Sequence, residues 1–170
     1  MKPLYKGLLL ALLHLLLVGS LGGKLLWDRA RLPRVWVRAA PYDPDLPIRG
    51  RYVRLRLEVD ARGDTLPQPT DVRSSRLFSA KLRVEGDRLV ALEGKPPNGH
   101  WIRLWQVGEE TRWVLALPVA FFIPEHVLDP SRRPAGEELW VEVTVPGKEP
   151  PRPIRLGVKK DNALTPLDLN

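Results

Sequence analysis

The feature that most constrains the fold is a run of alternating side chains at residues 51–59. Four apolar residues fall on one side of an extended chain and four polar or aromatic residues on the other: Val53, Leu55, Leu57 and Val59 against Tyr52, Arg54, Arg56 and Glu58. Because side chains alternate across a strand, this pattern predicts a half-buried β-strand. Gly50 stands just before it, where a backbone can kink, bulge or be approached closely by another backbone.

Shorter segments of the same kind follow one another along the chain. They lie at residues 35–39, 77–84, 88–92, 101–107, 111–117, 138–145 and 154–158. Short turns containing glycine predict that the second and third segments form a hairpin, and that the fourth and fifth form another. No long amphipathic helix separates these segments, so we expect an all-β fold, an antiparallel sandwich or a small barrel.

The N-terminus carries a different signal. Lys2 and Lys6 precede an apolar run at residues 7–23, which as a helix is roughly 26 Å long, a little less than the roughly 30 Å hydrocarbon core of a bilayer. Two interpretations fit: a signal peptide cut after Ser20, or a retained transmembrane anchor with Trp27 at the membrane interface. We favour the retained anchor.

Two opposing signals bear on the orientation. Basic residues after the run favour a cytoplasmic location for the C-terminal side, but an N-terminal span with a lysine-bearing lead normally acts as a signal-anchor that exports the domain after it. We therefore expect a single-pass protein of the cell membrane with an extracytoplasmic, periplasmic domain. The expected organisation is an anchor at residues 1–27, a stalk at 28–34, a β-domain at 35–160 and a loose tail at 161–170.

The chain is basic, with a formal net charge of +7 and an isoelectric point near 10.0. A basic excess favours anionic surfaces such as lipid headgroups or nucleic acid, but we favour the simpler interpretation, a solvated β surface. An exported location excludes nucleic acid as a partner. The chain contains no cysteine, so it forms neither disulfides nor thiolate metal sites.

Residues 50–57, Gly-Arg-Tyr-Val-Arg-Leu-Arg-Leu, resemble the signature of the GDYXXLXY family of membrane-anchored bacterial proteins. Gly50, Tyr52 and Leu55 match the signature, whereas Arg51 replaces its aspartate and Leu57 its second tyrosine. The resemblance continues in the Asp-Pro turn at residues 43–44, in Phe-Ile-Pro-Glu at 122–125 and in the late strand at 139–145. These elements keep the family's order and spacing.

The resemblance implies an anchored extracytoplasmic β-domain, in some cases associated with a polytopic membrane protein. It implies no enzymatic activity. The replacement of the motif aspartate by Arg51 argues against a role that needs a carboxylate at that position.

Gly50, Tyr52 and Glu125 are predicted to form one local site. Gly50 ends a proline-rigid loop, Tyr52 begins the strand, and Glu125 ends the apolar cluster at residues 121–124. A carboxylate there can accept hydrogen bonds from loop amides or pair with a neighbouring arginine. Two interpretations stay open, a structural clamp on the loop at residues 41–47 and a binding site.

Trp101, Arg103 and Trp105 alternate on the segment 101–107 and are predicted to share one face of a strand, with Trp113 on the partner segment. One interpretation is packing across the sheet, with the arginine stacked between indoles. The other is a recognition surface for a peptide, a glycan or a lipid headgroup. We include these three residues with Gly50, Tyr52 and Glu125 as candidate binding residues.

No catalytic, metal or cofactor site is predicted. The three histidines are far apart, and no Gly-rich phosphate loop or nucleophile motif is present. We therefore predict a membrane-anchored interaction module that binds a membrane-protein partner or an envelope ligand. The alternative is an anchored envelope hydrolase with an unrecognised nucleophile, for which Ser74, Ser75 and Ser79 near Lys81 are candidates.

Overall fold

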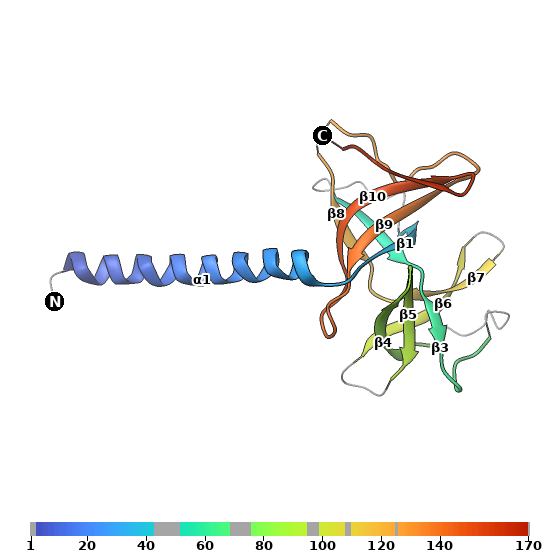
Figure 1. Cartoon of the computed structure of the whole chain (residues 1–170), viewed down its shortest axis with the longest axis horizontal. Coiled ribbons are helices and arrows are strands. Elements are labelled where there is room, and N and C mark those ends of the chain that lie inside the picture. The colour runs from blue at the N-terminus through green and yellow to red at the C-terminus, as the bar shows by residue number, and fades with distance from the viewer. Residues whose placement is uncertain are drawn as a thin grey trace. The chain divides into compact units, whose positions relative to one another are not determined.

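The computed structural model describes residues 3–42, 52–68, 76–94, 99–107, 110–124 and 126–169. The chain forms two compact units, Met1–Leu32 and Pro33–Asn170. Within the described residues, the elements are one helix and eleven strands (Figure 1): α1 Pro3–Arg31, β1 Arg34–Pro41, β2 Tyr52–Leu57, β3 Asp60–Arg62, β4 Phe78–Glu85, β5 Arg88–Glu93, β6 His100–Val107, β7 Glu110–Leu115, β8 Val119–Phe122, β9 Glu137–Thr144, β10 Arg152–Lys160 and β11 Ala163–Pro166.

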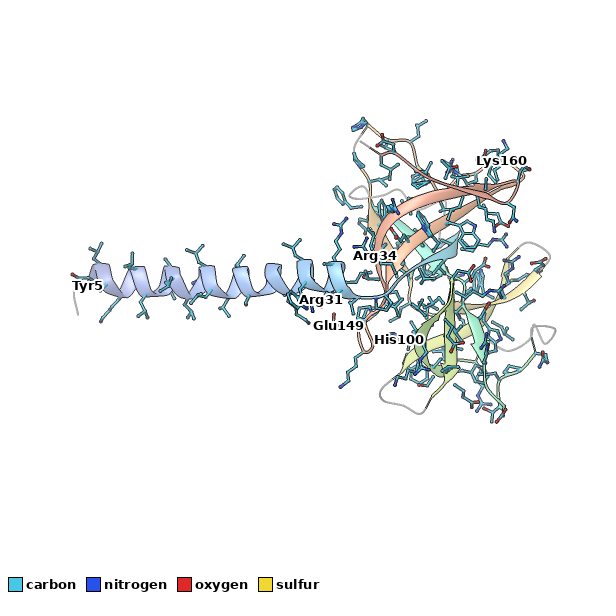
Figure 2. The ribbon with its side chains drawn as sticks, viewed as in Figure 1. Tyr5, Arg31, Arg34, His100, Glu149 and Lys160 are labelled. Carbon is cyan, nitrogen blue, oxygen red and sulfur yellow. The ribbon has the colours of Figure 1, made fainter. Side chains whose placement is uncertain are left out.

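Helix α1 makes up almost all of the first unit. The segment Leu4–Arg31 is long and apolar enough to cross a membrane, and its side chains project into open space on both sides in Figure 2. The helix also takes in most of the predicted stalk, because no proline or glycine lies between Asp28 and Pro33. Near its end the Arg31 guanidinium stacks on Trp27, 3.9 Å from the ring centroid.

The second unit is the predicted all-β domain, and it contains two sheets. The first has the strand order β11-β10-β9-β1-β2-β8, with every neighbouring pair antiparallel. The second has the order β3-β5-β4-β6-β7. Both predicted hairpins are present, as β4–β5 and β6–β7. One pair departs from the expected antiparallel pattern, since β3 runs parallel to β5.

The two sheets share one hydrophobic core. The predicted alternation of the organising strand is confirmed, because Val53, Leu55, Leu57 and Val59 are all buried in this core. Leu55 and Leu57 have no exposed surface, and full burial of such a side chain stabilises the fold by about 1.5–3 kcal/mol. The inner side chains of β6 and β7 enter the same core from the second sheet.

The predicted loose tail is wrong for its middle part. Residues Ala163–Pro166 form β11, which pairs antiparallel with β10. Asp161 and Asn162 both have positive φ, 48° and 67°, as a two-residue hairpin turn of type I′ requires. The Asp-Asn pair was therefore a sequence signal for this hairpin.

The organising strand also connects the two sheets. Beyond the end of β2, Glu58 forms an isolated antiparallel bridge with Val114 of β7, and the Val59 amide donates to the Trp113 carbonyl at 2.9 Å. The side of β2 that faces away from the core therefore continues onto β7 and β6. We call this combined surface the outer face.

Candidate functional site

Strand register places a set of charged and aromatic side chains together on the outer face. Trp105 lies opposite Arg112, and Arg103 lies opposite Val114. The bridge between Glu58 and Val114 aligns the outer side chains of β2 with these residues, because directly opposed residues point to the same face. Arg56, two residues before Glu58, belongs to the same face.

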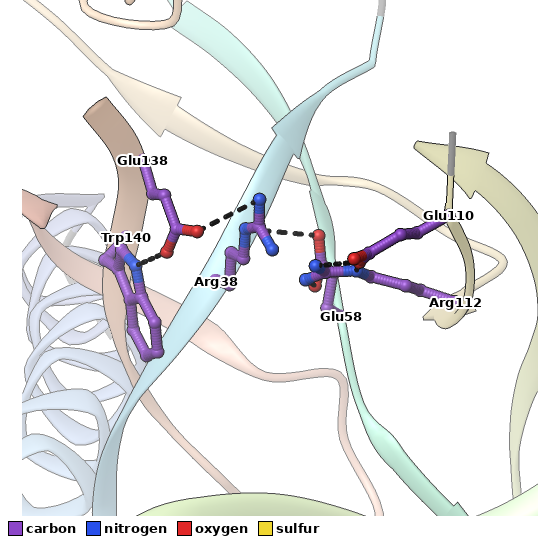
Figure 3. A network of polar contacts seen from close by, with 6 residues as sticks. All are labelled: Arg38, Glu58, Glu110, Arg112, Glu138 and Trp140. Carbon is purple, nitrogen blue, oxygen red and sulfur yellow. Dashed lines mark hydrogen bonds and ion pairs between the residues drawn. The ribbon is translucent and has the colours of Figure 1, made fainter. Parts of the chain in front are cut away.

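Glu58 is the centre of a carboxylate network on this face (Figure 3). Arg112 Nη1 donates to Glu58 Oε2 at 2.6 Å, and Arg38 Nε lies 3.7 Å from Glu58 Oε1. The Glu58 side chain is 11% exposed, whereas those of the two arginines are 27% and 29% exposed. The carboxylate is therefore the most shielded group of the three, and it lies between two cations.

The network extends outward from both arginines. Arg38 Nη2 lies 3.1 Å from Glu138 Oε1, and Trp140 Nε1 donates to the other oxygen of Glu138 at 3.1 Å. On the other side, Arg112 Nε donates to Glu110 Oε2 at 2.9 Å, and its Nη2 contacts the same oxygen. Positive and negative groups thus alternate, and every member of the network has a partner of opposite charge or a hydrogen-bond partner.

The contacts between Arg112 and its two glutamates shift the pKa values of Arg112 and Glu110. Burial alone lowers the pKa of Arg112, but its hydrogen bonds to Glu58 and Glu110 raise that pKa, and the net shift is upward. The same hydrogen bond and charge of Arg112 lower the pKa of Glu110. Both effects favour the charged forms.

A cleft of about 800 Å³ opens beside the network. Arg38, Glu58, Arg112 and Glu138 line it together with further residues of both signs, such as Asp60. Most of its charged groups lie in ion pairs, including Arg88 with Asp60 at 3.2 Å. Asp87 and Lys159 also line the cleft, and neither forms an ion pair among the described residues, so the unpaired charges there include both signs.

A second cluster of the outer face consists of Arg56, Arg103, Trp105 and Tyr42, and we call it the arginine–tryptophan stack. The Arg56 guanidinium lies 3.7 Å from the centroid of the Trp105 ring and 4.8 Å from that of Tyr42. The Arg103 guanidinium lies 4.6 Å from the same Trp105 centroid. Two cations therefore share one indole, a favourable contact for each of them with the ring.

Within the described part of the chain, the stack contains positive charge without a counter-charge. Arg56 is only 2% exposed, yet among the described residues neither it nor Arg103 forms a hydrogen bond or an ion pair. The Nε atoms of both are buried without a partner. Burial, and then the positive charge of Arg103, lower the pKa of Arg56. A shielded cation with no anionic partner is uncommon in proteins.

The predicted tryptophan surface is present in part. Trp101, Arg103 and Trp105 share the outer face of β6, and the two tryptophans are 43% and 39% exposed. Trp113 lies on the opposite side of the sheet, where it is buried in the core and meets Phe78 edge-on. The expected stacking of the arginine occurs on Trp105.

The other predicted site is described only at Tyr52, because Gly50 and Glu125 lie outside the described residues. Tyr52 pairs with Phe122 of β8 at one end of the first sheet. The Arg54 guanidinium lies 5.8 Å from the Tyr52 ring centroid. Tyr52 does not belong to the arginine–tryptophan stack, although both lie on the outer side of β2.

The residues with catalytic or metal-binding potential stay apart in the described part of the chain. Ser79 is buried and forms no hydrogen bond there with Lys81, while Ser74 and Ser75 lie outside the described residues. No group of three His, Asp or Glu side chains in the described part is placed to hold a metal ion. Burial lowers the pKa of His100, which favours its neutral form.

Arg56 is the main residue of the outer face that sequence reasoning missed. The alternation identified it as outward-pointing, which is correct, but gave no sign that it would be almost completely buried. The side chain that covers it, Trp105, belongs to another sheet and another part of the sequence.

Comparison of the chain with protein-family models, with curated proteins and with solved structures gives no match.

Proposed function

We propose that this chain is a membrane-anchored interaction module whose β-domain binds a membrane-protein partner or an envelope ligand. Helix α1 supports the anchor by its length and composition. The lysine-bearing lead supports a signal-anchor orientation with the domain on the extracytoplasmic, periplasmic side. The outer face of β6 and β2 is the proposed binding surface.

One observation carries this proposal: the arginine–tryptophan stack shields two cations, and neither of them has an anionic partner among the described residues. Removing a cation from water is unfavourable unless another charge or dipole compensates. The Trp105 ring compensates in part, since a desolvated cation–π contact contributes about 2 kcal/mol. The remaining cost is offset when a bound partner supplies the missing negative charge.

The exposed tryptophans fit the same function. Trp101 and Trp105 together present aromatic surface beside the two arginines. Tryptophan and arginine are the residues most enriched among the energetically dominant contacts of protein interfaces. The resemblance to anchored proteins associated with polytopic membrane proteins agrees with a membrane-protein partner.

Site-specific photo-crosslinking in cells tests the binding surface. A benzophenone amino acid replaces Trp101 in the full chain, and the control replaces Leu128, which is 89% exposed and lies outside the outer face strands. We expect a discrete adduct from position 101 and none of the same mass from position 128. Identical patterns from the two positions, or no adduct from position 101, contradict the proposal.

The absence of cysteine makes the orientation directly measurable. A Leu128→Cys variant carries a single thiol at an exposed position. If the domain is extracytoplasmic, a membrane-impermeant maleimide labels this thiol in intact spheroplasts. Labelling only after lysis contradicts the orientation, and a mature N-terminus at Leu21 contradicts the retained anchor.

A further inference from the structure

We propose that Arg56 and Arg103 form a carboxylate-binding site that receives an acidic side chain from a protein partner. This inference rests on the proposed function, because it assumes that the outer face is a binding surface. It adds the chemistry of the ligand and the residues that bind it. The site consists of the two guanidinium groups held on Trp105, with Trp101 exposed on the same strand.

The ion-pair partners of the other shielded arginines in this chain indicate that the ligand is a carboxylate. Six arginines in the described residues are shielded from solvent at least in part: Arg38, Arg56, Arg103, Arg112, Arg133 and Arg152. Four of them pair with glutamates within the domain: Arg38, Arg112, Arg133 and Arg152. Arg56 and Arg103 are the two exceptions. A carboxylate from outside the chain gives them the partner that each of the other four already has.

Stacking on an indole leaves the N–H groups at the edge of a guanidinium available for hydrogen bonds. A guanidinium that stacks on an indole uses its face, so the N–H groups at its edge stay free to donate in its plane. Arg103 is only partly buried and is the accessible member of the pair, whereas Arg56 is almost completely buried. Planar donors of this kind bind a carboxylate through two parallel hydrogen bonds.

A bound carboxylate also removes an unfavourable interaction. The two guanidinium groups lie over one Trp105 ring, and the pKa of Arg56 is lowered by burial and then by the charge of Arg103. A carboxylate between or beside the two cations offsets their repulsion, because it attracts both. The exposed Trp101 side chain provides apolar contact area next to the charge, as an interface with a peptide segment requires.

Arginine side-chain NMR on the full chain in uncharged maltoside micelles tests the inference. The probe is a blocked triglutamate peptide, titrated at constant ionic strength while the Nε–H signals of Arg103 and Arg56 are followed. We expect saturable shifts of both signals. An Arg103→Gln variant should weaken binding at least about tenfold, equivalent to about 1.4 kcal/mol.

The matched control is Arg83→Gln, which removes an exposed arginine of the adjacent strand β4 that has no stacking contact with Trp105. Its affinity for the peptide should stay within about twofold of the original. Equal losses in the two variants overturn the site, because the attraction is then a general effect of net charge. Circular dichroism confirms that both variants are folded.

Titration with inorganic phosphate and with phosphatidylglycerol added to the micelles distinguishes other anions. Saturable shifts with either of these and none with triglutamate overturn the carboxylate assignment. So does the absence of a saturable response to triglutamate. A crosslink from position 101 that persists in Arg103→Gln also overturns the site while the proposed function stands; peptide binding without any crosslink supports the site and contradicts the function.

Discussion

Glu58 and Arg56 lie two residues apart on one side of the same strand segment, but their charged groups have opposite surroundings. Glu58 is 11% exposed and lies between Arg38 and Arg112. Arg56 is 2% exposed and meets aromatic rings and a second arginine. In the part of the domain that the structure describes, the first charge has counter-charges and the second has none.

This difference is the basis for assigning a structural role to the carboxylate network and for proposing a binding role for the stack. The carboxylate network needs nothing from outside, because its cations and anions alternate from Glu138 to Glu110. The arginine–tryptophan stack has no such anion among the described residues. Functional sites often keep an unfavourable arrangement of this kind, because stability is given up there for binding. Four measurements test the difference between the two regions.

The largest effect is expected on the inner side of the same strand. Leu55→Asp places an unpaired carboxylate where the original side chain has no exposed surface. The cost is several kcal/mol, comparable with the ~5–15 kcal/mol total stability of a domain. The circular dichroism of the variant should show loss of the β-domain. A cooperatively folded variant would show that residue 55 does not lie in a core that excludes water.

Glu58→Gln should destabilise the domain by about 2–4 kcal/mol. It leaves Arg38 and Arg112 without their shared carboxylate, although both are about a quarter exposed and are partly rescued by water. Urea unfolding measures the change. The control is Glu85→Gln, which removes the more exposed pair with Arg62 and should cost no more than about 1 kcal/mol. Equal losses would mean that Glu58 has no special role.

Arg56→Met should leave stability unchanged or raise it by up to about 1 kcal/mol, because the variant removes a shielded charge and keeps a flexible side chain against Trp105. Arg38→Met, in contrast, should destabilise the domain by about 2 kcal/mol, since Glu58 and Glu138 lose a cation. Thermal unfolding compares the two variants. If Arg56→Met lowers the free energy of unfolding by more than about 1 kcal/mol, Arg56 has a structural role.

The smallest effect concerns pH. Arg112 lowers the pKa of Glu110 below its ordinary value of 4.5, first through a hydrogen bond and then through its charge. This contact contributes stability above about pH 4.5 and loses it as the pH falls through the folded-state pKa. Carboxylate NMR should show that the pKa of Glu110 rises towards 4.5 in Arg112→Gln.

The arginine–tryptophan stack supplies the contrast in the same titration. Its arginines stay charged over this range, and no described carboxylate is paired with them. Their side-chain signals should therefore be constant between about pH 3 and pH 7. A shift that tracks the titration of a carboxylate would reveal a counter-charge within the chain and would remove the distinction between the two regions.

The local secondary structure of this protein could be predicted from the sequence alone. Alternation at Val53–Val59 identified the inner side of β2, turn residues such as Gly86 identified the β4–β5 hairpin, and the apolar run identified α1. These features depend on neighbours along the chain, so the period of the side chains and the local backbone preferences suffice to predict them. The outward direction of Arg56 and the shared face of Trp101, Arg103 and Trp105 result from the same period.

The tertiary structure was needed to show which of the outward side chains are shielded from solvent and which charged groups lie next to each of them. Arg56 is covered by Trp105, and Glu58 is neutralised by Arg38 and Arg112, through pairings between strands that are distant in sequence. Alternation assigns a residue to a side of its strand but does not state what lies opposite. Burial and electrostatic partnership are properties of that opposing surface, and they exist only once the two sheets have come together.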